Sequence, residues 1–312
     1  MKSGQYQGVI LAAGHGSRMG PFGDAMPKPI APVCNRPLLA YQLDHLRSIG
    51  IEDVIIVIGH LGHRITQALG DGAGFGVRIR YVEQEKRLGL AHAVGQLEPH
   101  IQRPFVLMLG DIFFEMDNLA TLPALFEGAD TAAVLAVKDE PDQAAIRKNF
   151  AVIPGDGGIV KRVIEKPRVV PNRIKGCGIY LFDDRIFEAV RRTPRTAMRD
   201  EYELTDSIQI LIDYGYPVRM APIVEWDMNV TFIGDLIECC AHVLRREGRA
   251  SLLGKGCSVA RGATLAETVL GDGAAVQHPI RLERCVVMPG VTVDSRENLR
   301  NVVVTPQGVL QA

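Results

Sequence analysis

Short apolar runs alternate with segments of helical periodicity up to about residue 245. The runs typical of buried strands lie at 8–13, 53–58, 77–82, 105–110, 131–137 and 178–182. The helical segments lie at 37–48, 62–69, 90–97, 184–192, 203–213 and 234–246. This alternation predicts an α/β fold with a mostly parallel sheet and helices on both faces. Ligands bind such sheets outside the carboxyl ends of the strands, and both Gly14 and Asp111 lie just past such ends.

The pattern changes in the last sixty or so residues, where aliphatic side chains recur in steps of six, six and five. The recurring positions are Leu253, Val259, Leu265, Leu270, Val276, Leu282, Val287, Val293, Leu299 and Val304. A six-residue period is typical of a β-helix, in which short strands form three-sided coils with one inward aliphatic residue on each side. We therefore predict an α/β domain over residues 1–246 and a short left-handed β-helix over 251–312.

Composition narrows the class of protein. The chain has 312 residues, of which 47% are hydrophobic and 23% charged, which is ordinary for a soluble protein. A net charge of −1 argues against a general nucleic-acid binder. No apolar run approaches the ~20 residues that span a bilayer, and the polar start of the chain lacks a signal-peptide core. Six cysteines without a C-x-x-C pair fit reduced thiols, so we expect a cytoplasmic protein with neither membrane nor nucleic acid as partner.

The strongest single signal is the stretch GVILAAGHGSRMGPFGDAMPKP at residues 8–29, in which an apolar run opens into a glycine-rich loop. The loop and the segment after it carry Gly14, Gly16, Ser17, Arg18, Gly20 and Lys28. Glycines let backbone N–H groups close around a phosphate, and two fixed cations add to the same place. The stretch therefore indicates a nucleoside triphosphate site.

Three alternative interpretations of this loop fit its residues less well. A dinucleotide-binding turn needs an acidic residue about 20 positions on, at the end of the second strand, but the strand 54–58 ends in Gly59-His60. A Walker A loop needs Gly-Lys followed by Ser or Thr, which is absent here. A tight turn without a ligand leaves Arg18 and Lys28 unexplained.

Other polar residues follow strands or precede small-residue turns. Asp111 ends an apolar run and is a candidate Mg²⁺ ligand, because Mg²⁺ on a triphosphate takes one or two carboxylates; a turn cap is the alternative. Glu165 and Lys166 suit a sugar phosphate, although an exposed turn is the more common explanation of Glu-Lys-Pro taken alone. Gln84, shortly before Gly89, can donate and accept hydrogen bonds at a base edge, or can simply be a surface residue.

Together these segments resemble a known family. The order GVILAAGHGSRM, PKPIAPVCNRPLL, GLAHA, LGDIFF, EKP and GIYLF resembles that of the sugar-1-phosphate nucleotidyltransferases over residues 8–246 or so. EYELTD followed by IQILIDYGYPV is similar to the long glucose-1-phosphate thymidylyltransferases, some of which carry a C-terminal β-helix. The resemblance implies a nucleotide-binding α/β sheet on which a sugar 1-phosphate attacks the α-phosphorus in line. Pyrophosphate leaves, and no covalent enzyme intermediate forms.

The same resemblance implies roles for individual residues. The catalytic cations would be Arg18 and Lys28. The nucleotide would be bound by Leu11, Ala13, Gly14, Gly16, Ser17, Gln84 and Gly89. The sugar and its phosphate would be bound by Glu165, Lys166 and Gly178. Mg²⁺ would be bound by Asp111 and Asn229, with Asp227 as the alternative second ligand.

Two positions depart from the family pattern. Asn229 stands where a second metal aspartate usually lies, seven residues before Leu236, so the site loses one negative charge. Ala151 stands where a glycine commonly precedes the sugar contact, and its methyl group can narrow the sugar pocket. These changes leave the sugar undefined.

The base and the role of the tail are the remaining questions. Gly89-Leu90-Ala91 resembles the thymidylyl and uridylyl branch, whereas guanylyl enzymes more often have Thr at the second position, so we expect dTTP or UTP. The alternatives are a guanylyl- or cytidylyltransferase for another sugar phosphate, and a catalytically weak subunit that senses nucleotide sugars. The tail's one histidine, His278, has no evident partner in the sequence, so we expect assembly into a homo-oligomer rather than acyl transfer.

Overall fold

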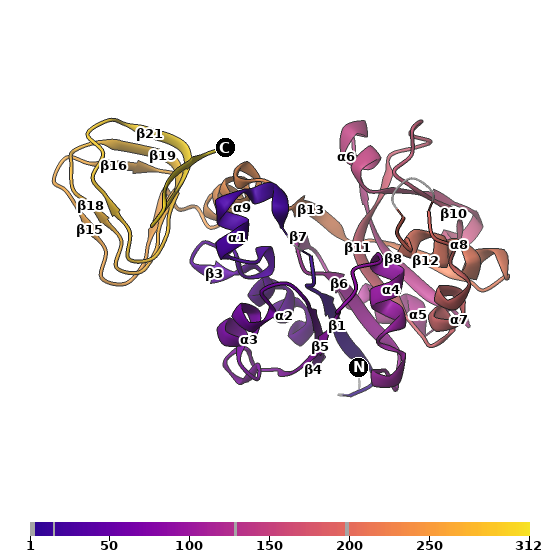
Figure 1. Ribbon diagram of the computed structural model, residues 1–312. Coiled ribbons are helices and arrows are strands. Elements are labelled where there is room, and N and C mark those ends of the chain that lie inside the picture. Colours follow the sequence, from indigo (N-terminus) through magenta and orange to yellow (C-terminus); the bar gives the residue numbers. More distant parts are fainter. Residues whose placement is uncertain (1–3, 15, 128–129, 197–199) are drawn as a thin grey trace. The chain divides into compact units, whose positions relative to one another are not determined.

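The computed structural model describes residues 4–14, 16–127, 130–196 and 200–312, and of Ser17 the backbone alone (Figure 1). The chain forms two compact units. The first, which we call the sheet unit, consists of Met1–Gly14 and Gln42–Asp227. The second, the coil unit, consists of His15–Tyr41 and Met228–Ala312.

The sheet unit is built on four parallel strands in the order β6-β1-β4-β5. Their bounds are β1 (Gln7–Leu11), β4 (Asp53–Ile58), β5 (Arg78–Glu83) and β6 (Phe105–Leu109). Along the chain, α2 (Leu38–Ser48) lies between β1 and β4, α3 (Gly62–Leu69) between β4 and β5, and α4 (Leu90–Gly95) between β5 and β6. The predicted parallel arrangement is confirmed in this half of the sheet.

The other half of the sheet is mixed. Its strands are β8 (Ala133–Asp139), β9 (Phe150–Pro154), β10 (Val160–Glu165), β11 (Ile174–Phe182) and β12 (Val218–Pro222). β11 runs antiparallel to β6, β8 and β9, whereas β12 runs parallel to β8. β9 and β10 must pair antiparallel, because the five residues between them are too few for a parallel crossover. The associated helices are α5 (Thr121–Phe126), α6 (Gln143–Lys148), α7 (Arg185–Arg192) and α8 (Leu204–Asp213).

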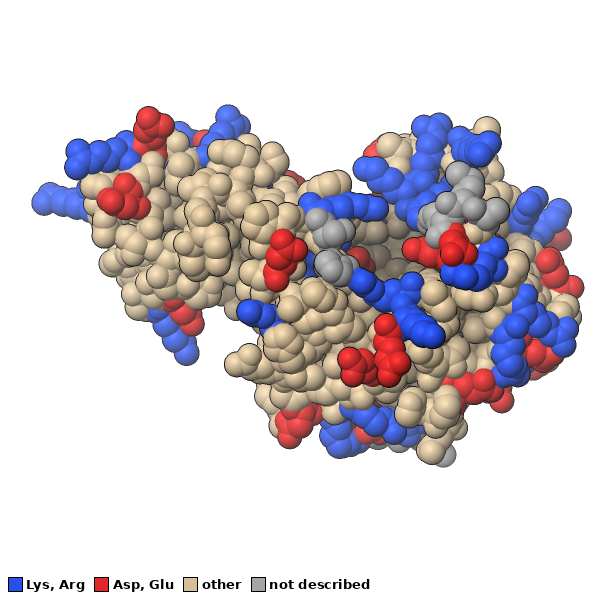
Figure 2. Space-filling view, in the orientation of Figure 1, with Lys and Arg blue, Asp and Glu red and all other residues tan. Residues whose placement is uncertain are grey.

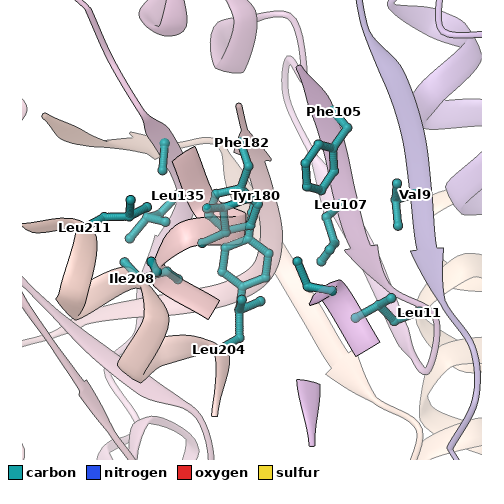
Figure 3. Packing of buried hydrophobic residues seen from close by; sticks show 14 of the residues in the cluster. Val9, Leu11, Phe105, Leu107, Leu135, Tyr180, Phe182, Leu204, Ile208 and Leu211 are labelled. Atoms are coloured by element: carbon teal, nitrogen blue, oxygen red, sulfur yellow. The ribbon is translucent and has the colours of Figure 1, made fainter. Parts of the chain in front are cut away.

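The core of the sheet unit lies between the strands and helix α8 (Figure 3). Alternate residues of a strand point to the same face, so Phe105 and Leu107 of β6 reach this core together. Phe182 of β11 packs against Phe105 at a ring-centroid distance of 5.9 Å, and Tyr180 stacks on Phe182 at 5.4 Å. Ile208 lies on the facing side of α8. This packing fixes the positions of the strand ends, where the candidate site residues lie.

Residues 251–312 of the coil unit wind into a short β-helix (Figure 1). Ser251 pairs with Thr268, and Val269 with Val286, each seventeen residues further on, which is the predicted six, six and five taken together. One side contains β14 (Ser251–Leu253), β17 (Thr268–Leu270), β19 (Arg281–Val287) and β21 (Leu299–Thr305), with β22 (Gly308–Gln311) antiparallel to β21. Another contains β15 (Ser258–Val259), β18 (Ala275–Val276) and β20 (Thr292–Val293), and β16 (Thr264–Ala266) pairs with β19.

The interior of the β-helix confirms most of the predicted aliphatic positions. Leu270, Val276, Leu282, Val287, Val293 and Val304 are buried, whereas Val259, Leu265 and Leu299 are only partly buried. Leu253, in the first coil, is half-exposed because no earlier coil covers it. The coils therefore bury one another's aliphatic residues, as expected for a stacked repeat.

One corner of the β-helix joins the coils to α9 (Ile233–Arg246). We call Glu267, Arg284 and Asn301 the corner ladder, because they occupy the same place in successive coils, with φ of 43°, 52° and 53°. A left-handed backbone is unfavourable for Glu and Arg, so side-chain partners must compensate. Arg284 donates to Asn301 Oδ1 at 2.9 Å, to Glu267 Oε2 at 3.1 Å and to Glu238 Oε2 of α9 at 2.6 Å. Arg245 of α9 donates to Glu238 and Glu267 as well.

The remaining elements are short. The coil unit contains α1 (Pro21–Ala25), the 3-10 turns Ser17–Met19 and Lys28–Ile30, and a hairpin of β2 (Pro32–Val33) and β3 (Arg36–Pro37). β7 (Ile112–Met116) and β13 (Val224–Asn229) form a small separate sheet, in which Phe113 meets Trp226 edge to face at 5.9 Å. β13 brings the chain to the candidate metal ligand Asn229.

Candidate functional site

Asp111 lies in the tight turn between β6 and β7, at the carboxyl edge of the parallel strands. The preceding Gly110 donates its N–H to the Leu11 carbonyl at 2.9 Å, which holds the turn against the end of β1. A Cβ on Gly110 would lie 2.9 Å from the same oxygen, so only glycine allows this approach. The end of β1, which leads into Gly14, and the Asp111 turn thus share one sheet edge, as the sequence predicted.

Gln42 is a supporting residue that our reading of the sequence missed. Its Nε2 donates at 2.8 Å to the carbonyls of both Leu109 and Ile112, which flank Asp111. The residue is only 1% exposed, so these two hydrogen bonds are made away from water. Gln42 therefore fixes the backbone that presents Asp111. One signal was available: Gln42 falls on the buried stripe of α2, where a polar residue needs a partner.

We expect Gln42→Leu to weaken both the fold and the metal response. Two buried carbonyls lose their donor, which costs about 1–3 kcal/mol of stability. The turn that carries Asp111 is then held less firmly, so the divalent-metal concentration for half-maximal rate rises. Urea unfolding and a metal titration of the rate check the two effects. An unchanged metal requirement in a measurably destabilised variant would confine Gln42 to the fold.

The candidate base-binding residues lie in the segment between β5 and α4. Gln84 is buried, and its Nε2 lies 3.4 Å from Nδ1 of His92, whose ring stacks on Tyr202 at 6.4 Å. Burial, reinforced by the charge of Lys86, lowers the pKa of His92, which favours its neutral form at pH 7. The Gln84 amide thus has a neutral imidazole ring beside it.

Two backbone hydrogen bonds to Tyr202 hold the segment between β5 and α4. Its N–H donates to the Leu88 carbonyl at 2.7 Å, and its carbonyl accepts from the Ala91 N–H at 2.9 Å. Gly89 lies between them with φ 109° and ψ 173°, a conformation that only glycine adopts readily. A Cβ on Gly89 would strike the Tyr202 carbonyl oxygen and lie 2.6 Å from its nitrogen. Tyr202 entered the sequence argument only as part of a motif, and its role in holding Gly89 was not foreseen.

Gly89→Ala is therefore expected to displace the base-binding segment. Backbone strain of about 1–3 kcal/mol adds to the clash with Tyr202, so the KM for the nucleotide should rise at least tenfold. Gly215→Ala is the matched control, because Gly215 also has a positive φ, of 80°, but open space around it. Initial rates at varied nucleotide concentration give the comparison. Equal KM values for the two variants would contradict a role of Gly89 in nucleotide binding.

The candidate sugar-phosphate residues also lie in the sheet unit. Glu165 ends β10 and accepts a hydrogen bond from Thr205 Oγ1 at 3.0 Å, and Lys166 Nζ lies 3.5 Å from its other oxygen. Lys166 has a left-handed backbone, with φ 40°, and its N–H donates to the Asn149 carbonyl. The backbone thus holds Lys166 in one conformation and leaves its side chain partly exposed to a ligand.

Gly178 is brought to the Asp111 turn. It has φ 74°, and a Cβ there would lie 2.9 Å from Leu109 and 3.0 Å from Ile112. These two residues flank Asp111, so any side chain at Gly178 would push against the turn. The structure therefore places this sugar-contact candidate beside the metal-ligand candidate.

Asp227 lies in a buried network of four charges. Its side chain is 2% exposed, and both of its oxygens accept from Lys175 Nζ, at 2.7 and 2.8 Å. Lys138 lies 3.5 Å away, and Glu140 bridges the two lysines at 3.0 and 3.3 Å. Burial alone would lower the pKa of Lys175, but the neighbouring carboxylates outweigh it and raise this pKa. A carboxylate engaged by two ammonium groups is a poor metal ligand, which favours Asn229 as the second-ligand candidate.

The triphosphate-loop candidates lie mostly in the coil unit. Lys28 is 8% exposed, and its aliphatic stem lies along Gly16, whose Cβ would be 3.3 Å from Lys28 Cγ. Gly23 also lies close to Gly16, since a Cβ added to Gly23 would be 2.5 Å from the Gly16 carbonyl oxygen. Arg18 is exposed, and the side chain of Ser17 lies outside the described residues. Lysine is almost never buried this deeply unless its charge has a partner, and Lys28 remains a candidate cation of the loop.

The predicted residues divide between the two units. The sheet unit holds Leu11, Ala13, Gly14, Gln84, Gly89, Asp111, Glu165, Lys166, Gly178 and Asp227. The coil unit holds Gly16, Ser17, Arg18, Lys28 and Asn229. Of the residues whose placement is described, no three His, Cys, Asp or Glu side chains gather as a metal site.

Charge is mixed over the surface in view. Figure 2 shows Lys and Arg side chains interspersed with Asp and Glu, with no large region of one sign on this face. Within the described ranges, no helix combines the length and the apolar character that crossing a membrane requires.

Comparison with known proteins identifies two regions. Residues 7–227 match the family described as nucleotidyl transferase, and residues 241–311 match the C-terminal hexapeptide region described as GlmU-like. The first match covers more than half of the chain. The second coincides with the end of α9 and the β-helix.

Individual relatives agree with these matches. The chain is 34% identical to the low-salt glycan biosynthesis nucleotidyltransferase Agl11 of Haloferax volcanii, over 76% of this chain and 66% of that protein. It is 33% identical to a glucose-1-phosphate thymidylyltransferase of Streptomyces griseus, over 86% and 78%, respectively. It is 32% identical to the UTP–glucose-1-phosphate uridylyltransferase AglF of Haloferax volcanii, over 73% and 93%. A UDP-glucose pyrophosphorylase structure shares the fold, with a TM-score of 0.67 at 21% identity over 77% of this chain and 99% of that one.

Proposed function

This chain belongs to the nucleotidyl transferase family, and on that premise we propose that it transfers the nucleotidyl group of dTTP or UTP to a sugar 1-phosphate. The products are a nucleoside diphosphate sugar and pyrophosphate. The observation that carries the proposal is the Asp111 turn, held at the carboxyl edge of β6 by Gly110 and Gln42. Such a turn presents one carboxylate at the edge where α/β sheets generally bind their ligands.

The proposed reaction is an in-line displacement. A phosphate oxygen of the sugar 1-phosphate forms a bond to the α-phosphorus while the bond from that phosphorus to the bridging oxygen breaks. The electron pair leaves with pyrophosphate, so no residue of the chain becomes covalently attached. Catalysis then rests on positioning and on charge stabilisation.

Each group of residues has one task in this proposal. The backbone at Gly16 and the guanidinium of Arg18 hold the triphosphate, and the buried ammonium of Lys28 stabilises charge on the α-phosphate and the leaving group. Glu165 and Lys166 orient the sugar and its phosphate. The oxygens of Asp111 and Asn229 would hold Mg²⁺, which when bound supplies charge neutralisation at the phosphates.

The preference for a pyrimidine rests on the segment from Gln84 to Ala91. The Gln84 amide and the backbone at Gly89 are the polar groups that this segment offers to a base edge, and both are held by neighbours. The two closely matching relatives named for a base act with thymidylyl and uridylyl groups. A pyrimidine base is therefore compatible with the polar groups of this segment and with the names of the two relatives.

A panel assay tests the proposal. The purified full chain with Mg²⁺ is given dTTP, UTP, CTP or GTP with glucose 1-phosphate or another hexose 1-phosphate, and released pyrophosphate is measured. Release that requires both substrates and is fastest with dTTP or UTP supports the proposal. Faster release with GTP or CTP would reassign the base. Nucleotide binding without release for any pair would favour the sensing subunit instead.

Two further parts of the proposal concern the protein's setting. We place the enzyme in the cytoplasm, where nucleoside triphosphates are supplied. We also propose a homo-oligomer assembled through the β-helix, because its end strands offer unpaired edges. Light scattering of the full chain over a range of concentrations measures the mass, and a monomer at every concentration would remove this part.

A further inference from the structure

The coil unit contains both the candidate triphosphate loop and the β-helix. Lys28 is followed within four residues by the β2–β3 hairpin, and this hairpin contacts α9 and the coils. Nothing in the proposed reaction requires the β-helix, so these contacts call for a separate explanation.

We propose that the β-helix acts as a scaffold that positions Lys28, and that Asn35 is the positioning residue that connects them. The inference rests on the proposed function, because it assumes that Lys28 is the cation of the transfer reaction. It assigns the β-helix a task in catalysis in addition to any task in assembly.

The direct connection is one hydrogen bond. Asn35 Nδ2 donates to the Leu270 carbonyl at 2.8 Å, and Leu270 is a fully buried residue of β17 in the second coil. Asn35 and Cys34 form the two-residue turn of the hairpin, with φ of 62° and 47°. Positive φ favours Asn or Gly, and of these two only Asn offers a side-chain donor to the Leu270 carbonyl.

A second connection runs through α9. Cys34 N–H donates to Cys240 Sγ at 3.4 Å, and Cys240 Sγ donates to the Pro32 carbonyl at 3.7 Å. Both cysteines are buried. Because α9 is joined to the coils by the corner ladder, the hairpin is held by the β-helix from two directions.

The hairpin in turn is joined closely to Lys28. The Ala31 N–H donates to the Lys28 carbonyl at 2.9 Å, and the Leu38 N–H donates to the Ala31 carbonyl at 3.1 Å. Tyr41 adds a hydrogen bond from its hydroxyl to the Val33 carbonyl at 3.0 Å. A hairpin this short is not stable alone and depends on what it packs against. The coils and α9 supply that support, so the position of the Lys28 backbone depends on them.

Asn35→Gly isolates the connection. Glycine keeps the left-handed turn and removes only the side-chain hydrogen bond to Leu270. We expect kcat to fall about tenfold with little change in the nucleotide KM, because a misplaced cation affects the transition state more than binding. Asn35→Asp, which tolerates the turn but offers no donor, should lose at least as much. The matched control is Asn301→Gly, which removes a left-handed Asn and its hydrogen bond to Arg284 elsewhere in the same unit; its kcat should stay within about twofold.

A second measurement does not depend on turnover. Lys28 is buried, so acylation of its amine by a small reagent, followed by mass spectrometry of the peptide, reports how firmly it is held. Asn35→Gly should be labelled at Lys28 severalfold faster than the parent, and Asn301→Gly at the parental rate. Equal labelling and equal kcat in both variants would overturn the scaffold role. If the parent itself releases no pyrophosphate with any substrate pair, the proposed function fails, and the labelling comparison still decides whether the coils hold Lys28.

Discussion

Lys28→Ala is expected to lower kcat by about 10²- to 10³-fold while changing the nucleotide KM far less. Removing one preorganised donor to developing negative charge costs this much in other enzymes. The reason for the asymmetry is that a buried ammonium acts most strongly where charge builds up in the transition state, and less in the ground-state complex. Steady-state rates at varied dTTP or UTP measure both constants.

Two variants control this result. Lys148→Ala removes an exposed lysine of α6 in the sheet unit and should leave the rate unchanged. Lys28→Arg keeps the charge but spreads it over a larger planar guanidinium, so it should recover only part of the rate. An unchanged kcat in Lys28→Ala, with normal metal dependence, would remove Lys28 from the mechanism.

The second large effect is expected at Asp111. Asp111→Asn replaces a carboxylate with a neutral amide, which is a weaker ligand for a hard cation. We expect the Mg²⁺ concentration for half-maximal rate to rise by about tenfold or more, or activity to be lost. Asn229→Asp adds a carboxylate and should lower that concentration if Asn229 is the second ligand. A Mg²⁺ titration of the initial rate compares the three proteins.

Asp227→Asn separates the two candidates for the second ligand. It leaves Lys175 buried without its main partner, which should cost about 3–5 kcal/mol of stability. The metal requirement of the folded variant should nevertheless match that of the parent. The opposite pattern, a raised metal requirement in Asp227→Asn and a silent Asn229→Asp, would make Asp227 the ligand and would require the charge network to open.

The hydrophobic periodicity of the sequence predicted where many strands and helices lie, but not whether neighbouring strands run parallel or antiparallel. The apolar run at 53–58 and the amphipathic segment at 62–69 coincide with β4 and α3, because buried strands and covering helices impose different spacings. Two-residue strands such as β2 and β3 carry too few residues to show a period. The antiparallel course of β11 follows from its neighbours in space, which no local pattern records.

The candidate site residues also divide into those that local sequence predicts and those that only the fold brings together. Asp111 and Lys28 were found through local sequence, because a strand end and a glycine loop are local features. Gln42 was not, since its partners are about seventy residues away. His278 shows the same limit: it lacked an evident partner in the sequence, and the structure places its Nε2 2.7 Å from Asp294 Oδ1, about one coil further on.

The boundaries of the two units also depend on contacts between residues far apart in the sequence. The sequence predicts one domain to residue 246 and another from 251, a division that stays a prediction, whereas the compact units divide near residues 14, 42 and 227. Segment His15–Tyr41 joins the coil unit because Cys34 and Asn35 find their partners in α9 and β17. Neither residue stands out in the sequence.

The repeat of the β-helix limits how its length can change during evolution. Inserting or deleting seventeen residues adds or removes a whole coil, and the aliphatic interior stays in phase. A change of six residues would move every later residue to the next side, so that Arg284 would no longer follow Glu267 at the corner that contacts α9. Related chains should therefore differ here in steps of one coil, added at the end remote from Leu270 so that its contact with Asn35 is kept.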